Sequence, residues 1–305
     1  MTGSMIDVQS LQKTFGGHQV LNDVSFTVSR GETFAFLGRN GAGKTTTIRI
    51  LLGLLESDSG SVQVMGHDPG KTSVELRRRI GYLAEDQTMY EWMTPIELCR
   101  FLKPFYPTWD PSLADKLLNG FELPRHSRIG NLSKGQSVQL GLTVALAHRP
   151  ELAILDDPAL GLDPISRRQF SRDLVDHMQA AGCTVFYSSH LLNEVEAVAD
   201  TVAILDAGRI VRQSATEVLR EQVKQVCLSA QAIRTISKPR GLLDVRRYAD
   251  RFVITIDEAP LFLNQLESHR TPHEVTDLNL DDIFESYVIG RPDDWPKANP
   301  ALATV

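Results

Sequence analysis

The chain has 305 residues, of which 42% are hydrophobic and 23% are charged, a composition typical of a folded globular protein. Its net charge of -6 argues against a nucleic-acid binder, which needs a basic surface. No apolar run is long enough to cross a bilayer, and the N-terminus lacks the layout of a signal peptide. The three scattered cysteines favour a reducing compartment and argue against a metal site or a disulfide framework.

The N-terminal part of the chain predicts a β subdomain followed by a phosphate-binding loop. Residues 5–35 indicate antiparallel strands, because polar and apolar residues alternate, most clearly over 24–28. A strand-like apolar run over 33–37 then leads into a glycine-rich turn, and helical apolar spacing follows from residue 46. The turn matches the P-loop pattern G-x-x-x-x-G-K-[ST] with the residues Gly38, Arg39, Asn40, Gly41, Ala42, Gly43, Lys44 and Thr45.

This strand, turn and helix provide what a nucleotide phosphate needs. The glycines let backbone N–H groups converge on an anion, and the N-terminus of the helix adds a favourable dipole. Lys44 supplies a charge for the outer phosphates, and the Thr45 hydroxyl can bind Mg²⁺. A glycine turn without a ligand is the alternative, but it does not account for the lysine and threonine in this context.

The middle of the chain predicts two more strands, over 61–65 and 80–83, and then an inserted helical subdomain from about residue 94 to 149. Within it, the segment Leu132-Ser133-Lys134-Gly135-Gln136 precedes an apolar-periodic helix that runs through Ala147. Ser133 is a favourable N-cap, so this helix presents free N–H groups and the positive end of its dipole.

A second group of strands follows the helical subdomain. The apolar run over 152–157 indicates a strand buried on both faces of a parallel sheet, and it ends in Asp156 and Asp157. Ligands bind at the carboxyl ends of such strands, so we expect Asp156 to face Mg²⁺ held by Thr45. Residues 184–187 predict another core strand, and 202–211 predict a hairpin.

The composition changes beyond about residue 218. A strand is predicted over 252–256 and helices over 261–268 and 278–287, which together indicate a small α+β appendage. The last residues are rich in proline and aspartate and predict a frayed tail.

The motifs in this order resemble those of the ATP-binding subunits of ABC (ATP-binding cassette) transporters, over about residues 5–215. The segments 38–45, 132–136, 152–157, 161–163 and 188–190 are similar to the Walker A loop, the LSGGQ signature, Walker B, the D-loop and the switch-histidine loop. The loop 103–110 also resembles a bacterial, exporter-type branch of the family.

The resemblance implies an α/β P-loop NTPase of ABC type with an antiparallel β subdomain, an inserted helical subdomain and a small C-terminal α+β appendage. We expect the ATPase domain over 5–217, with its helical subdomain at about 88–149. The accessory domain is expected over 218–290 and a flexible tail over 291–305.

The resemblance also implies ATP and Mg²⁺ as cofactors and assigns site residues. Those expected to contact ATP are Phe15, which would stack on adenine, the loop 38–45 with Thr46, and Ser133, Gly135 and Gln136 of a second subunit. The expected Mg²⁺ ligands are Thr45, Asp156 and Glu85. The expected catalytic residues are Asp157, His190, Glu85 and Lys44, with His190 contacting the γ-phosphate.

Two of these positions depart from the family pattern. Asp157 stands where a glutamate usually polarises the attacking water, so hydrolysis is expected to be slow unless the backbone has shifted. Alternatively, Asp157 only caps the turn before Pro158. Glu85 replaces a glutamine, and its charge would either tighten metal binding or repel an incipient hydroxide; a solvated surface glutamate is the other interpretation.

One chain holds one P-loop and one signature segment, so a working site needs two chains, either as a homodimer or with a related chain. A groove beside the Glu85 loop would receive the membrane subunit, and the candidates to line it are Tyr90, Trp92, Met93 and Trp109. Alternatively these are core residues, above all Trp109.

We therefore expect an ATPase subunit that drives a separate membrane permease, with export as the expected direction of transport. We expect it to act at the cytoplasmic side of the membrane and to have no nucleic acid as a partner. Two alternatives stay open: a soluble ABC-type ATPase acting on ribosomes or DNA, and a regulatory cassette with low turnover.

Overall fold

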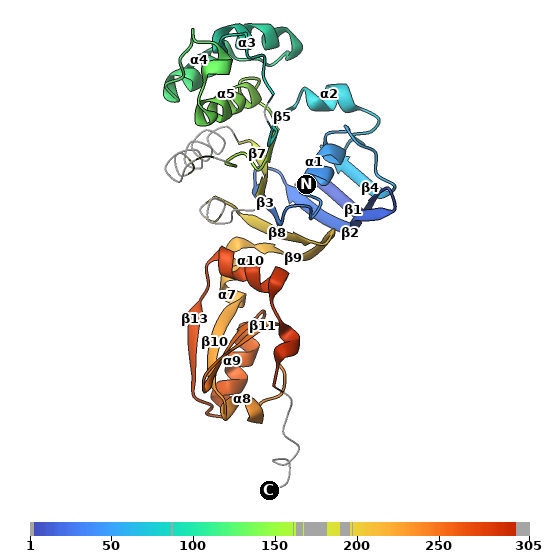
Figure 1. Cartoon of the computed structure of the whole chain (residues 1–305). Coiled ribbons are helices and arrows are strands. Elements are labelled where there is room, and N and C mark those ends of the chain that lie inside the picture. Colours follow the sequence, from blue (N-terminus) through green and yellow to red (C-terminus); the bar gives the residue numbers. More distant parts are fainter. Residues whose placement is uncertain are drawn as a thin grey trace. The chain divides into compact units, whose positions relative to one another are not determined.

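The computed structural model describes residues 3–86, 88–160, 162, 167, 182–189, 196 and 198–296. The chain divides into two compact units, Met1–Gln213 and Ser214–Val305 (Figure 1). No helix in these described ranges is both long enough and apolar enough to cross a membrane.

The first unit contains a three-stranded antiparallel sheet in the order β2-β1-β4. Its strands are β1 (Ser4–Phe15), β2 (His18–Ser29) and β4 (Ser59–Val64). In the central strand, Val8 pairs with Phe26 on one side and with Val62 on the other. The antiparallel strands predicted within residues 5–35 are thus confirmed for β1 and β2.

A six-stranded sheet in the order β5-β6-β7-β3-β8-β9 forms the second layer. Its strands are β3 (Thr33–Gly38), β5 (Ile80–Leu83), β6 (Leu152–Asp156), β7 (Thr184–Ser189), β8 (Thr201–Asp206) and β9 (Arg209–Ala215). The pairs β5–β6, β6–β7, β7–β3 and β3–β8 are parallel. The carboxyl ends of β6, β7 and β3 are therefore neighbours, which is the edge where ligands bind in such sheets.

Four phenylalanines join the two sheets in a buried core. Phe26 of the antiparallel sheet contacts Phe34, Phe36 and Phe186 of the parallel sheet, with ring centroids 5.3–5.9 Å apart. Helix α1 (Lys44–Leu51) adds the buried side chains of Ile48 and Leu51 to the same cluster. This packing holds α1 against the core that β3 shares.

The predicted helical region is confirmed (Figure 1, green). After the short helix α2 (Ser73–Arg77), the structure contains α3 (Pro95–Leu102), η1 (Lys103–Phe105), α4 (Pro111–Gly120), η2 (Ile129–Asn131) and α5 (Lys134–Leu146). The sequence determines where these helices begin, since Thr94 forms a capping box with Glu97, and the Asp110 carboxylate accepts the N–H groups of Ser112 and Leu113.

The second unit is built on a four-stranded antiparallel sheet in the order β11-β12-β10-β13. Its elements are α7 (Thr216–Gln222), β10 (Lys224–Ser229), α8 (Ala232–Thr235), β11 (Leu242–Tyr248), β12 (Arg251–Ile256), α9 (Ala259–Ser268), β13 (His273–Asp277), α10 (Leu280–Ile289) and η4 (Pro292–Asp294). The strand and two helices predicted here correspond to β12, α9 and α10. Their core includes Val226, Ile254 and Phe262.

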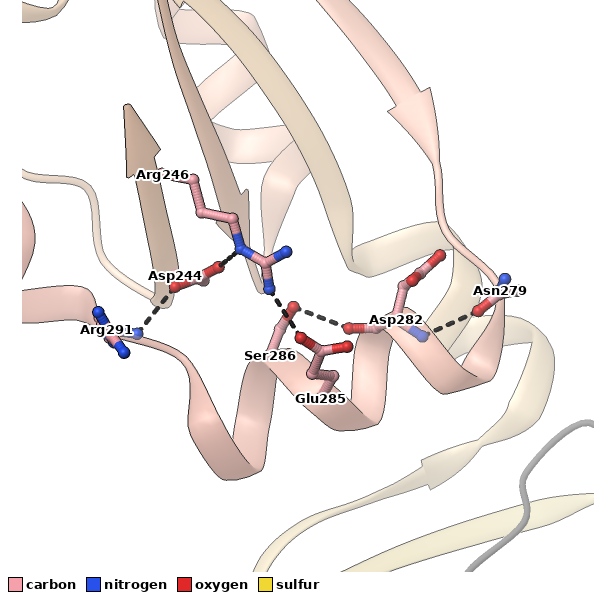
Figure 2. A network of polar contacts seen from close by, with 7 residues as sticks. All are labelled: Asp244, Arg246, Asn279, Asp282, Glu285, Ser286 and Arg291. Carbon is pink, nitrogen blue, oxygen red and sulfur yellow. Dashed lines mark hydrogen bonds and ion pairs between the residues drawn. The ribbon is translucent and has the colours of Figure 1, made fainter. Parts of the chain in front are cut away.

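A polar network fastens the end of α10 to β11 (Figure 2). The buried Asp244 carboxylate accepts a hydrogen bond from Arg246 Nε at 2.7 Å and from the backbone N–H of Arg291 at 2.9 Å. The guanidinium of Arg246 also reaches Glu285 at 2.9 Å. Gly290 is required at this junction, because a Cβ there would lie 2.2 Å from the carbonyl oxygen of Ser286.

Candidate nucleotide site

The predicted P-loop connects β3 to α1, and its backbone path depends on glycine. Gly41 and Gly43 have φ angles of +81° and +113°, which L side chains rarely adopt. A Cβ on Gly43 would lie 2.6 Å from Leu21 Cδ2, and one on Gly38 would lie 2.8 Å from the carbonyl oxygen of Leu205. The loop therefore keeps its backbone N–H groups at the N-terminus of α1, where an anion is favoured.

Lys44 lies at the start of α1 with its ammonium group buried inside this loop. Its Nζ donates to the Gly38 carbonyl oxygen at 2.8 Å and lies 3.3 Å from Oδ2 of Asp157. Both charged side chains are less than 8% exposed. The structure thus brings together the P-loop lysine and the carboxylate that the sequence predicts as the catalytic base.

Asp156 ends β6 and is buried. Its Oδ1 accepts a hydrogen bond from Ser188 Oγ at 2.7 Å, whereas its buried Oδ2 has no hydrogen-bond partner in the described part of the chain. Burial raises the pKa of this carboxyl group, while the hydrogen bond from Ser188 and the nearby Thr45 hydroxyl lower it; the Asp157 charge raises it further and Lys44 opposes that effect.

An orphaned carboxylate oxygen beside a threonine hydroxyl fits a small divalent cation. Mg²⁺ prefers hard oxygen ligands and is usually held by one or two carboxylates together with substrate phosphates. Asp156 Oδ2 and the Thr45 hydroxyl could supply protein ligands. They are two of the three Mg²⁺ ligands that the sequence predicts, and the third is Glu85. Among the described residues, no group of three or more His, Cys, Asp or Glu side chains could hold a metal ion.

Asp157 follows directly and has an unusual backbone. Its φ of +43° is left-handed, which is uncommon outside glycine, asparagine and aspartate. Its N–H points at β7 and donates both to the carbonyl oxygen of Ser188 at 3.1 Å and to Ser188 Oγ at 3.2 Å. Turn capping alone would not account for the ion pair between its side chain and Lys44.

Glu85 follows β5, and its side chain is exposed. Partial burial raises its pKa, the negative charges of Asp157 and Asp156 raise it further, and Lys44 opposes them. Glu85 is therefore within electrostatic reach of both aspartates. Tyr82, a neighbour in β5 that was not among the predicted site residues, has its pKa raised to about 12 by burial and by Asp156. The proximity of Tyr82 to the site follows from β5 pairing with β6.

The signature segment forms the N-terminus of α5 as predicted. Ser133 caps the helix in a reciprocal arrangement: its hydroxyl accepts from the Gln136 N–H at 3.2 Å, and its own N–H donates to the Gln136 side chain at 3.0 Å. A Cβ on Gly135 would be accommodated without a clash, since its nearest neighbour would be Leu162 Cδ2 at 3.8 Å, an ordinary van der Waals distance.

Of the other predicted site residues, Phe15 is described by the structure, whereas His190 and most of the predicted D-loop are not. Phe15 lies at the end of β1 and is 46% exposed. The Lys13 ammonium lies over its ring, 5.3 Å from the centroid, so stacking on adenine would use the other face or displace Lys13. His190 lies outside the described residues, as do Gly161 and Asp163 of the predicted D-loop.

The aromatic residues proposed for a partner groove divide into two sets. Tyr90 and Trp92 are exposed and in contact, and Tyr90 also contacts Phe101, which contacts Phe105. We call these four residues the aromatic cluster. Met93 is instead buried and Trp109 is partly buried, so the core interpretation holds for Met93. Phe101 and Phe105 were missed, although their spacing of four residues is typical of one helix face.

Comparisons with known proteins agree with this geometry. The family model described as "ABC transporter" matches residues 21–160. The ABC transporter ATP-binding protein YtrB of Bacillus subtilis is 32% identical over 218 residues, which cover 72% of this chain and 74% of the relative. The bacitracin transport ATP-binding protein BcrA of Bacillus licheniformis is 34% identical and covers 69% of both chains.

Among solved structures, an ATP-binding subunit of an ABC transporter is similar, with a TM-score of 0.64 and 30% identity, covering 71% of this chain and 92% of that one. The predicted fold class is thereby confirmed. The chain belongs to the ATP-binding subunits of ABC transporters and is an ABC-type ATPase.

Proposed function

We propose that this subunit binds MgATP through Lys44, Thr45 and Asp156 and hydrolyses it with Asp157 as the general base. The ion pair between Lys44 and Asp157 supports this assignment, because it puts the base beside the group that would bind the outer phosphates. Mg²⁺, when bound, would neutralise charge developing on the phosphates. The oxygen of a water molecule attacks the γ-phosphorus, and one proton of that water passes to Asp157. The bond between the γ-phosphorus and the oxygen that bridges it to the β-phosphate breaks, which gives ADP and inorganic phosphate. His190 would contact the γ-phosphate.

The proposed catalytic site is shared between two chains. Ser133, Gly135 and Gln136 start a helix whose N–H groups and dipole suit an anion, and in our proposal that anion is the ATP of a second subunit. A homodimer with two-fold symmetry would close two such sites. Phe15 would stack on adenine at its own subunit's P-loop.

We further propose that the partner is a separate membrane permease and that transport is outward. The aromatic cluster carries this proposal, since Tyr90, Trp92 and Phe105 are each close to half exposed or more, and monomeric proteins rarely leave such apolar patches uncovered. The cluster lies soon after Glu85 in the chain, so a partner bound there could sense the nucleotide site. The name of one relative refers to bacitracin transport, which fits an exporter. The subunit would then act at the cytoplasmic face of the membrane.

Coexpression with its permease tests this proposal. The wild-type chain should copurify with a polytopic membrane protein, and Trp92→Ser combined with Tyr90→Ser should abolish copurification while leaving ATP binding intact. Leu261→Ser is a matched control, because Leu261 is 71% exposed but belongs to the second unit. Recovery with ribosomes or DNA instead, unaffected by the double substitution, would contradict the permease assignment.

A low-turnover regulatory role is the second candidate. The observation in its favour is the short Asp157 side chain held by Lys44, because a base misplaced by about 1 Å can lose on the order of 100-fold in rate. Steady-state ATPase rates of the assembled complex distinguish the two roles: transport requires turnover that rises with substrate, whereas a regulatory cassette binds ATP with little turnover.

A further inference from the structure

Ser188 contacts both Asp156 and Asp157 at the end of β6. In the sequence it is the first residue of the segment 188–190, for which only His190 is predicted to have a role. Ser188 lies in β7, directly opposite Asp156 in the parallel register, and is fully buried. Its hydroxyl donates to Asp156 Oδ1 at 2.7 Å and accepts the Asp157 N–H at 3.2 Å. One hydroxyl group thus uses its only proton on the first aspartate and a lone pair on the second.

The bond to Asp156 determines which carboxylate oxygen is left for a cation. With Oδ1 held by Ser188, the carboxylate cannot rotate freely, and Oδ2 has no hydrogen-bond partner in the described ranges. An oxygen that is buried and unbonded is costly unless a ligand satisfies it. The Ser188 hydroxyl therefore presents Oδ2, rather than either oxygen at random, to the site.

The bond to Asp157 restrains the backbone that aims the second carboxylate. The Asp157 N–H is shared between the hydroxyl and the carbonyl oxygen of Ser188, and this occurs where φ is +43°. Aspartate adopts the left-handed region more readily than most residues, and the two hydrogen bonds to Ser188 hold Asp157 in this conformation. From this backbone the carboxylate reaches to 3.3 Å from the Lys44 ammonium.

We propose that Ser188 is a positioning residue that orients Asp156 Oδ2 toward Mg²⁺ and Asp157 toward the attacking water, without contacting the nucleotide itself. This inference rests on the roles proposed above for Asp156 and Asp157. Partners that hold metal ligands in orientation typically affect metal affinity or activity by about 10- to 100-fold when they are removed.

Binding of Mn²⁺, used as a spectroscopic probe for Mg²⁺, tests this without turnover. In electron paramagnetic resonance titrations of the full chain with a non-hydrolysable ATP analogue, Ser188→Ala should weaken Mn²⁺ binding by about 10-fold or more. Affinity for the analogue in EDTA should be unchanged, and the turnover number should fall with little change in KM. Ser188→Thr keeps the hydroxyl and should retain most of the Mn²⁺ affinity.

Thr184→Val is the matched control for a purely structural effect. Thr184 is equally buried in β7, and its hydroxyl accepts the Gly31 N–H at 2.8 Å, at the opposite end of the strand. If Ser188→Ala does not fold, Ser188→Cys provides a side chain of the same shape, slightly larger and with a weaker donor, and should lose Mn²⁺ affinity in the same way. Wild-type affinity in both Ser188→Ala and Ser188→Cys, or an equal loss in Thr184→Val, would overturn the proposal.

Asp156→Asn separates this inference from the proposed function. If Asp156→Asn weakens Mn²⁺ binding and the Ser188 variants do not, only the positioning role fails. If Asp156→Asn itself leaves Mn²⁺ binding unchanged, the metal-binding role of Asp156 is wrong, and the role of Ser188 fails with it.

Discussion

Lys44 Nζ lies 3.3 Å from Asp157 Oδ2 in a buried ion pair, so the group expected to bind phosphate and the group expected to activate water are direct neighbours. Lys44 also donates to the Gly38 carbonyl oxygen. A nucleotide phosphate reaching Lys44 would compete with Asp157 for the ammonium. Phosphate binding and the orientation of the base are therefore coupled through one side chain.

Lys44→Ala should weaken ATP binding by about 100-fold or more, because several charge-assisted hydrogen bonds would be lost at once. Isothermal titration calorimetry with MgATP measures this directly. Lys71→Ala is a suitable control, since Lys71 is a cation of the same unit that pairs with Asp68 rather than with the P-loop. An unchanged affinity in Lys44→Ala would show that the P-loop assignment is wrong.

Substitutions at Asp157 and Glu85 identify the general base. Asp157→Asn should lower the ATPase rate by about 100-fold or more, since an amide is a poor proton acceptor, and Asp157→Glu should raise it. Glu85→Gln should keep most of the activity, because Glu85 is exposed and lies on a loop. Rates are measured in the assembled complex at saturating Mg²⁺, so that weaker metal binding does not imitate a chemical defect.

The opposite pattern would assign the base to Glu85: Asp157→Asn would then remain active and Glu85→Gln would not. Rates like those of the wild type in both variants would exclude both residues as the base.

The sequence predicts much of this site because its motifs combine a local pattern with a definite strand context. Ser133 illustrates this, since a capping residue and its helix are adjacent in the chain. Ser188 illustrates the limit: its partner Asp156 is 32 residues away, and only the β6–β7 register brings the two together.

The strands of the second unit were harder to predict, because several of them lack a clear pattern of alternating apolar residues. Strand β13 (His273–Asp277) is short and mostly exposed, so it lacks the apolar alternation that would reveal it, and β10 and β11 were also missed. By contrast, β12 was predicted because Phe252, Ile254 and Ile256 alternate along it and are buried.

The buried His148 should make the first unit sensitive to acid. His148 stacks on Tyr106 with ring centroids 4.2 Å apart, and its Nε2 is 3.2 Å from the Ile80 carbonyl oxygen. Burial lowers its pKa below the ordinary value of 6.5, opposed by the backbone carbonyls of Ile80 and Val144. The His148 side chain therefore binds a proton more readily in the unfolded chain than in the folded protein.

The contribution of His148 to the free energy of unfolding should therefore be constant above about pH 6.5. It should decrease as the pH falls from there through the lowered pKa of His148. Urea unfolding between pH 7.5 and 5 measures this slope. His148→Gln cannot titrate and should have a shallower pH dependence, although its stability at pH 7.5 should be lower. An identical pH slope in both proteins would show that His148 does not cause the acid sensitivity.

Gly135 and Ser133 should separate stability from activity at the signature segment. Gly135→Ala should stabilise the protein by up to about 1 kcal/mol, because alanine favours helix and a Cβ there would clash with no atom. It should nevertheless lower the ATPase rate, since the methyl group would intrude on the proposed contact with the partner's ATP. Ser133→Ala should cost about 1 kcal/mol through the lost cap.

Thermal melts and ATPase rates measure both effects. Gly120→Ala is the matched control, because Gly120 ends α4, a Cβ added there would have no atom within 4 Å, and the residue lies outside the signature segment. A Gly135→Ala variant with full activity would argue against a close approach of ATP to this helix.

Asp244→Ala should destabilise the second unit while leaving nucleotide binding intact. The Asp244 carboxylate is 5% exposed and accepts from Arg246 Nε and from the Arg291 N–H, so its removal leaves these donors without that acceptor (Figure 2). The expected cost is about 2 kcal/mol. Calorimetry should show a lower unfolding temperature for this unit, and limited proteolysis should cut it sooner. The control is Asp250→Ala, at an exposed position of the same unit. It should change neither the unfolding temperature nor the rate of proteolysis, and the MgATP affinity of both variants should match that of the wild type.

A loss of affinity in Asp244→Ala would mean that the second unit influences the nucleotide site.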